Sequence, residues 1–160
     1  MKIAIIGSRE GFTYGEVMPK LNKYYNSNNP KENCFITGGA RGVDKIVELY
    51  AKELGIPIEI IRPINPSNKM DYLFRNVEII TKADKIIVFW NGYSKGTKFV
   101  IDYAKARNKE LVVILSDKTS TLPNGNPNGE FNINLKTTPT DSSKFKKMLQ
   151  RGVQLKCHTK

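Results

Sequence analysis

Residues 36–44 read ITGGARGVD, and this stretch joins two different hydrophobic patterns. The apolar run 34–36 precedes it, with the length and composition of a buried strand. After it, Val43, Val47 and Ala51 recur at the spacing that places side chains on one face of a helix. The stretch therefore predicts a strand, a glycine-rich turn and a helix, in that order.

The turn has the composition of an anion-binding site. Gly38, Gly39 and Gly42 allow the main chain to approach a ligand closely, and the following helix presents free amide donors at its N-terminus. Arg41 adds a planar set of donors that suits phosphate. We expect the turn to bind phosphate through Gly38, Gly39, Ala40, Arg41 and Gly42; the alternative is a plain tight turn with Arg41 in solvent.

The same order of strand, turn and helix recurs along the first 115 residues. Four further apolar runs have strand length, at residues 3–6, 58–61, 86–90 and 111–115. Helical spacing recurs between them, for example at Leu73, Val77 and Ile80. This alternation predicts a single α/β domain over residues 1–115, with a doubly wound parallel sheet and helices on both faces. Residues 116–160 are rich in Ser, Thr, Asn, Pro and Gly, and we expect an irregular basic extension with a small hairpin around residues 124–128.

In such a sheet, ligands bind beyond the carboxyl ends of the strands, where strand order reverses. Two further turns should meet the first one there. One is Gly7-Ser8-Arg9, and the other is Asn91 to Thr97, where Ser94 and Thr97 can contact a ligand; the alternative for Thr97 is a simple helix cap. The candidate ligand-binding residues from these turns and their neighbours are Gly7, Ser8, Arg9, Asp44, Trp90, Gly92, Ser94, Lys95, Gly96 and Thr97.

Composition excludes several classes of protein. The net charge of +11 favours polyanionic ligands. The two cysteines lack C-x-x-C spacing, so we expect no metal site and no disulfide framework. No apolar run has the length of a membrane span and no signal sequence is recognisable, which favours a cytoplasmic protein without membrane contact. Neither G-x-G-x-x-G nor a P-loop occurs.

Taken together, four motifs resemble the SLOG superfamily of Rossmann-like nucleotide-binding proteins, and most closely its small YspA-related family. They are GSR at 7–9, TGGARGVD at 37–44, Met70 with Arg75 and Asn76, and WNGYSKGT at 90–97. The resemblance covers about residues 1–115. It implies a parallel sheet of order 3-2-1-4-5 and a pocket for a phosphorylated nucleotide or nucleotide derivative, with no further cofactor. It also implies Arg75 and Asn76 as ligand-binding residues.

The resemblance leaves the activity open. The superfamily includes LOG phosphoribohydrolases, which cleave nucleoside monophosphates, and DprA proteins, which bind single-stranded DNA. Arg75 matches the LOG arginine, but Lys98-Phe99-Val100 stands where the LOG loop carries its glutamate, and Asp102 is the next carboxylate. Hydrolysis at a sugar carbon needs such a group. Binding is therefore the main expectation, with an N-glycosidase that uses Arg75 and Asp44 as the alternative.

The basic extension supports a further alternative. Residues 111–160 hold eight Lys/Arg against three Asp/Glu. These cations can contact nucleic acid or simply face solvent, since aromatic residues, which stack on bases, are nearly absent among them. The basic residues concerned are Lys144, Lys146, Lys147, Arg151, Lys156 and Lys160. A homo-oligomer is also left open.

Overall fold

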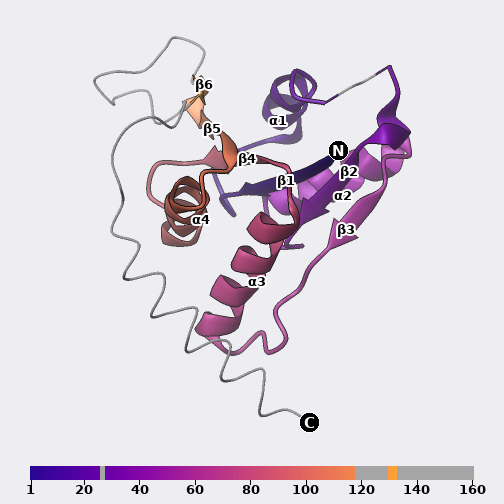
Figure 1. Ribbon diagram of the computed structural model, residues 1–160. Helices are drawn as coiled ribbons and strands as arrows, with labels where there is room; N and C mark the ends of the chain where they lie inside the picture. The colour runs from indigo at the N-terminus through magenta and orange to yellow at the C-terminus, as the bar shows by residue number, and fades with distance from the viewer. Residues whose placement is uncertain (26–27, 118–129, 133–160) are drawn as a thin grey trace.

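A computed structural model describes residues 1–25, 28–117 and 130–132. Its central feature is one sheet with the strand order β3-β2-β1-β4-β5-β6 (Figure 1). The first five strands are parallel, and β6 joins β5 in the antiparallel direction. The strands are β1 (Lys2–Gly7), β2 (Cys34–Thr37), β3 (Ile58–Ile60), β4 (Lys85–Trp90), β5 (Glu110–Leu115) and β6 (Glu130–Asn132). The parallel 3-2-1-4-5 core implied by the sequence is thereby confirmed.

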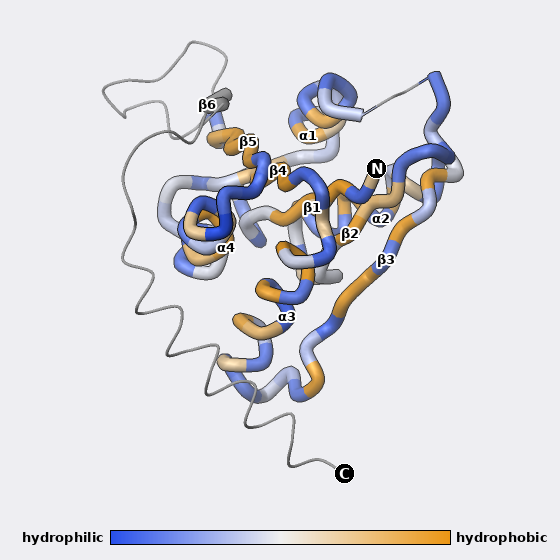
Figure 2. Tube along the Cα trace, in the orientation of Figure 1, coloured by the Kyte–Doolittle hydropathy of each residue, from blue (hydrophilic) through white to orange (hydrophobic). Residues whose placement is uncertain are grey.

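Four α-helices and one short 3-10 helix connect these strands. They are α1 (Tyr14–Leu21), η1 (Pro30–Glu32), α2 (Val43–Leu54), α3 (Lys69–Lys82) and α4 (Lys95–Ala106). The strands are the most apolar part of the chain, and polar and apolar residues alternate along the helices (Figure 2). This distribution is what a sheet buried on both faces requires.

The sheet separates two hydrophobic clusters, because alternate side chains of a strand point to opposite faces. Ile3 and Ile5 of β1 belong to the cluster that contains residues of α1 and α2. Ala4 and Ile6 belong to the cluster that contains residues of α3 and α4. The domain is therefore doubly wound, as the sequence pattern predicts.

The sequence pattern did not predict helix α1. It spans eight residues and contains Pro19, which is unfavourable inside a helix. A capping box between Thr13 and Glu16 stabilises its start, and Val17 and Leu21 bury its inner face. Tertiary packing and this cap, rather than helical propensity, explain why the segment is helical.

The extension remains largely a prediction. Of residues 116–160, the structure describes Ser116, Asp117 and β6. The hairpin expected around residues 124–128 and the basic residues 144–160 lie outside the described residues. Within the described ranges, no helix is long and apolar enough to cross a membrane.

Candidate anion-binding site

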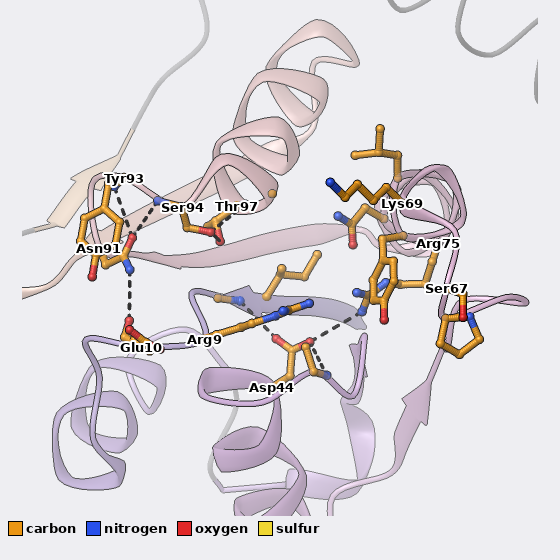
Figure 3. Close-up of a pocket in the computed structure, with 18 residues that line it drawn as sticks. Arg9, Glu10, Asp44, Ser67, Lys69, Arg75, Asn91, Tyr93, Ser94 and Thr97 are labelled. Atoms are coloured by element: carbon orange, nitrogen blue, oxygen red, sulfur yellow. Dashed lines mark hydrogen bonds and ion pairs between the residues drawn. The ribbon is translucent and has the colours of Figure 1, made fainter.

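A cavity of about 790 Å³ opens at the carboxyl edge of the sheet. The turns after β1, β2 and β4 line it together with the loop before α3 and the first half of α3 (Figure 3). A second cavity of about 480 Å³ lies on its β2–β3 side. Both linings include Arg9, Ala40, Pro66, Tyr72 and Arg75, so the two cavities form one continuous recess with these residues at its middle.

Helix α3 places Arg75 in this recess. Asn68 caps the helix by accepting a hydrogen bond of 2.9 Å from the amide of Met70. Two turns further on, Arg75 and Asn76 lie on the buried face, with only 7% and 6% of their surfaces exposed. The charge of Arg75 thus lies in the protein interior at the edge of the cavity, although arginine side chains are usually exposed to water.

Gly38 makes room for this arginine. A Cβ atom at position 38 would lie 1.1 Å from Nη1 of Arg75, so any other residue would displace the guanidinium. The second glycine of the turn, Gly39, has a φ of 67° and lies against Arg62. The two glycines therefore make room for arginine side chains, and both also line the smaller cavity.

The guanidinium of Arg75 is only partly paired. Its Nη1 lies 3.7 Å from Oδ2 of Asp44, beyond normal hydrogen-bond distance. Both Nε and Nη1 are buried without a hydrogen-bond partner in the described part of the chain. Asn76 likewise leaves its buried Oδ1 without a partner there. Buried polar atoms are nearly always paired in folded proteins, so three unpaired atoms in two adjacent residues are an unusual feature of this part of the recess.

Asp44 holds the β2–α2 turn in place. Its carboxylate accepts hydrogen bonds from the amides of Gly7 and Ala40, both at 3.2 Å. Burial raises the pKa of Asp44, although these amides, the amide of Gly38 and the charge of Arg75 oppose the rise. Burial also lowers the pKa of Arg75, and the nearby charge of Arg9 lowers it further. An arginine nevertheless stays protonated at neutral pH, so the recess keeps its positive charge.

Tyr72 lies between two cations. The guanidinium of Arg9 lies 6.0 Å from the centre of its ring, and that of Arg75 lies 5.7 Å from it. Such contacts between a cation and an aromatic ring are attractive. Tyr72 therefore contacts two guanidinium groups, and all three residues line both cavities.

The β4–α4 turn satisfies most of its own polar groups. Oδ1 of Asn91 accepts from the amides of Tyr93 and Ser94, and the Oγ of Ser94 accepts from the amide of Thr97. Ser8 is buried and joins this turn to β1, because its Oγ accepts from the amide of Asn91. Ser94 is thus the N-cap of α4, the role that the sequence suggested for Thr97, and both residues line the larger cavity.

The other site residues predicted from the sequence lie inside or outside the linings of the two cavities. Arg41 lines the smaller cavity, is 75% exposed and pairs with Glu10 at 3.0 Å. Asn76 and Gly96 line the larger cavity. Trp90 donates from Nε1 to the carbonyl of Ser94 and, like Gly92 and Lys95, lies outside both linings. Gly42 (φ 88°) is also outside them, packed against the Arg9 carbonyl.

Sequence reasoning missed the loop between β3 and α3. This loop contributes Arg62, Pro63, Pro66 and Ser67 to the recess, and the first turns of α3 add Lys69, Tyr72 and Leu73. The loop contains no glycine, which is why the search for glycine-rich turns passed over it. Its place directly after a predicted strand was the available signal, since every carboxyl-end loop of a parallel sheet reaches the same edge.

The carboxylates that could replace the LOG glutamate are mostly engaged elsewhere. Asp102 pairs with Lys98, Glu78 pairs with Lys82, and Glu16 caps α1. Asp71 accepts a hydrogen bond from the amide of Asn65. Among the residues described for the larger cavity, Asp44 and Glu10 are the two carboxylates. Asp44 is held by amides and Glu10 is paired with Arg41.

This fold and its recess define a Rossmann-like α/β domain. Residues 1–64 match the model of the YspA, cpYpsA-related SLOG family. The resemblance inferred from the sequence motifs is therefore confirmed.

Two solved structures are similar to the domain. One is DNA processing protein A (DprA) from Streptococcus pneumoniae, with 17% identity and a TM-score of 0.59 over 94% of this chain. The other is DprA from Helicobacter pylori, whose structure was described for its single-stranded DNA binding mode, with 20% identity and a TM-score of 0.53 over 95% of this chain. The chain spans 56% of the first protein and 73% of the second. At these identities the likeness shows a shared fold. No curated protein matches the chain.

Proposed function

We propose that this domain binds a phosphorylated nucleotide or nucleotide derivative in the recess at the carboxyl edge of the sheet. The observation that carries the proposal is the buried guanidinium of Arg75 with two unpaired donors, Nε and Nη1. An unpaired buried charge costs stability, and a bound phosphate would supply the missing acceptors.

The rest of the recess suits the remainder of a nucleotide. Ile6 and Leu73 line the larger cavity with apolar surface, and Tyr93 lies 71% exposed at its rim, where it can cover a base. Asn76 offers an unpaired acceptor to a sugar hydroxyl or an exocyclic amine. A phosphate next to an apolar, hydroxyl-bearing group is the chemistry that this combination recognises.

The positions of the carboxylates agree best with a protein that binds a nucleotide without hydrolysing it rapidly. A catalytic carboxylate must reach the sugar or an attacking water. Both oxygens of Asp44 accept main-chain hydrogen bonds, and Glu10 forms an exposed ion pair. No observation in the site favours cleavage of the glycosidic bond, so the proposal remains a binding function.

Calorimetry with matched ligands tests the proposal. The purified 160-residue protein is titrated with adenosine, guanosine and their 5′-mono- and diphosphates, and with a single-stranded oligodeoxynucleotide. At least one nucleotide should bind ten or more times more tightly than its nucleoside. Equal affinities for nucleosides and nucleotides, or binding of the oligonucleotide alone, would refute it; the latter would point to a DprA-like function.

A further inference from the structure

We propose that the smaller cavity is a second phosphoryl subsite and that Arg62 makes the domain selective for ligands with two linked phosphoryl groups. The inference rests on the proposed function and adds a substrate class to it, namely nucleoside diphosphates and their pyrophosphate derivatives. It also gives the ligand a direction, with the phosphates on the β2–β3 side and the nucleoside on the β4–α4 side.

The charges of the two cavities carry the first step. The described lining of the smaller cavity contains Arg9, Arg41, Arg62 and Arg75 and no carboxylate. The lining of the larger cavity contains three cations, Arg9, Lys69 and Arg75. It also contains the carboxylates of Asp44 and Glu10. Although Arg41 and Arg75 pair with carboxylates, neither Arg9 nor Arg62 forms an ion pair with any described residue. The smaller cavity is therefore the more cationic part of the recess.

Main-chain donors add to this positive charge. Arg62 lies against Gly39, since a Cβ atom there would be 2.9 Å from Nη1 of Arg62. Among the described residues, the amides of Gly39 and Arg41 have no hydrogen-bond acceptor. Unpaired amides beside a guanidinium form the kind of concave donor surface that binds phosphoryl oxygens.

The β4–α4 turn lacks this capacity. The amides of Tyr93, Ser94 and Thr97 already donate within the turn, to Asn91 and Ser94. The larger cavity instead presents hydroxyl, amide and apolar groups, which suit a sugar and a base. Because Arg75 lines both cavities, a first phosphate bound to Arg75 would place a second one toward Arg62.

The variant Arg62→Gln tests this assignment. Arg62 is an exposed loop residue, so its replacement should leave the fold intact, which a thermal melt checks. The control is Arg107→Gln, which makes the same substitution at an exposed residue outside both linings. Affinities for AMP, ADP, GMP and GDP are measured at one ionic strength for the wild-type protein and both variants.

The wild-type protein should bind its preferred nucleoside as the diphosphate about tenfold more tightly than as the monophosphate, as the loss of one charge-assisted contact implies. Arg62→Gln should remove this preference by weakening the diphosphate alone, and Arg107→Gln should keep it. Equal loss of mono- and diphosphate affinity in Arg62→Gln, or a wild type without diphosphate preference, would overturn the subsite and leave nucleotide binding intact. Failure of all four nucleotides to bind the wild type would overturn both proposals.

Discussion

Replacing Arg75 by methionine should abolish most of the affinity for a phosphorylated nucleotide. The substitution keeps the apolar stem of the side chain and removes the guanidinium, whose Nε and Nη1 have no acceptor among the described residues. A charge-assisted hydrogen bond contributes about 1.5–3 kcal/mol. If each of the two donors contributes about 1.5 kcal/mol, the total of about 3 kcal/mol corresponds to an affinity about 150-fold lower.

The assay is isothermal titration of the preferred nucleotide into wild-type and Arg75→Met proteins. Removing the cation leaves the carboxylate of Asp44 buried without its ion pair, so thermal unfolding must show that the variant is folded. Arg75→Lys serves as a second variant, because it keeps the charge but loses the Nε donor and the planar geometry. Arg107→Met is the matched control: Arg107 follows α4 and stacks on Tyr103.

We expect Arg75→Met to bind about 100-fold more weakly or worse, Arg75→Lys to be intermediate, and Arg107→Met to bind like the wild-type protein. A folded Arg75→Met protein with wild-type affinity would refute the reasoning. The phosphate would then have to bind elsewhere, and the buried donors of Arg75 would need another explanation.

Three further perturbations test individual parts of the site. Gly38→Ala should weaken nucleotide binding at least about tenfold, the effect of losing one charge-assisted contact, because the alanine Cβ would lie 1.1 Å from Nη1 of Arg75. A calorimetric affinity equal to that of the wild type would show that the guanidinium can move without consequence. Asp44→Asn should flatten the dependence of stability on pH: burial raises the pKa of Asp44 above its ordinary value of 3.8, so its contribution to the free energy of unfolding is complete below that value and is lost as the pH rises through the raised pKa. Denaturant unfolding across this range measures the effect, and identical pH profiles for the variant and the wild type would contradict the cause given for the shift. Finally, chromatography of nucleoside monophosphates incubated with micromolar protein should show little or no free base. General acid–base assistance typically contributes ~10² to 10⁴ in rate, and other residues occupy the position of the LOG glutamate. Fast turnover that is lost in Asp44→Asn would establish a relocated catalytic carboxylate.

The fold was predictable because its signals are local and repeated. Ile- and Val-rich runs such as 3–6 and 86–90 can hardly be other than strands buried on both faces, and the helical stripes between them require parallel connections. Helix α1 was harder to predict, since Pro19 argues against a helix and its burial depends on residues distant in the sequence. Local pattern thus predicts the sheet, whereas tertiary packing decides the marginal helix.

The site was predictable only in part. The turn at 38–42 and Arg75 were identified from composition and from the family resemblance, and the structure brings them together. That Gly38 admits the guanidinium of Arg75 depends on a contact across 37 positions of sequence, which no local pattern encodes. Arg62 belongs to a loop without glycine, so its place in the recess became apparent only from the strand order.

The most direct measurement of the central claim is the ¹⁵N NMR signal of the Arg75 side chain. In ¹⁵N-labelled protein, the Nε–Hε resonance of Arg75 is assigned by its loss in Arg75→Lys and followed during titration with the preferred nucleotide and with its nucleoside. The buried donor should acquire an acceptor, so we predict a saturable shift with the nucleotide and no comparable shift with the nucleoside. An Arg75 resonance that stays unchanged at saturating nucleotide, while signals elsewhere move, would contradict the assignment of this recess as the phosphate site.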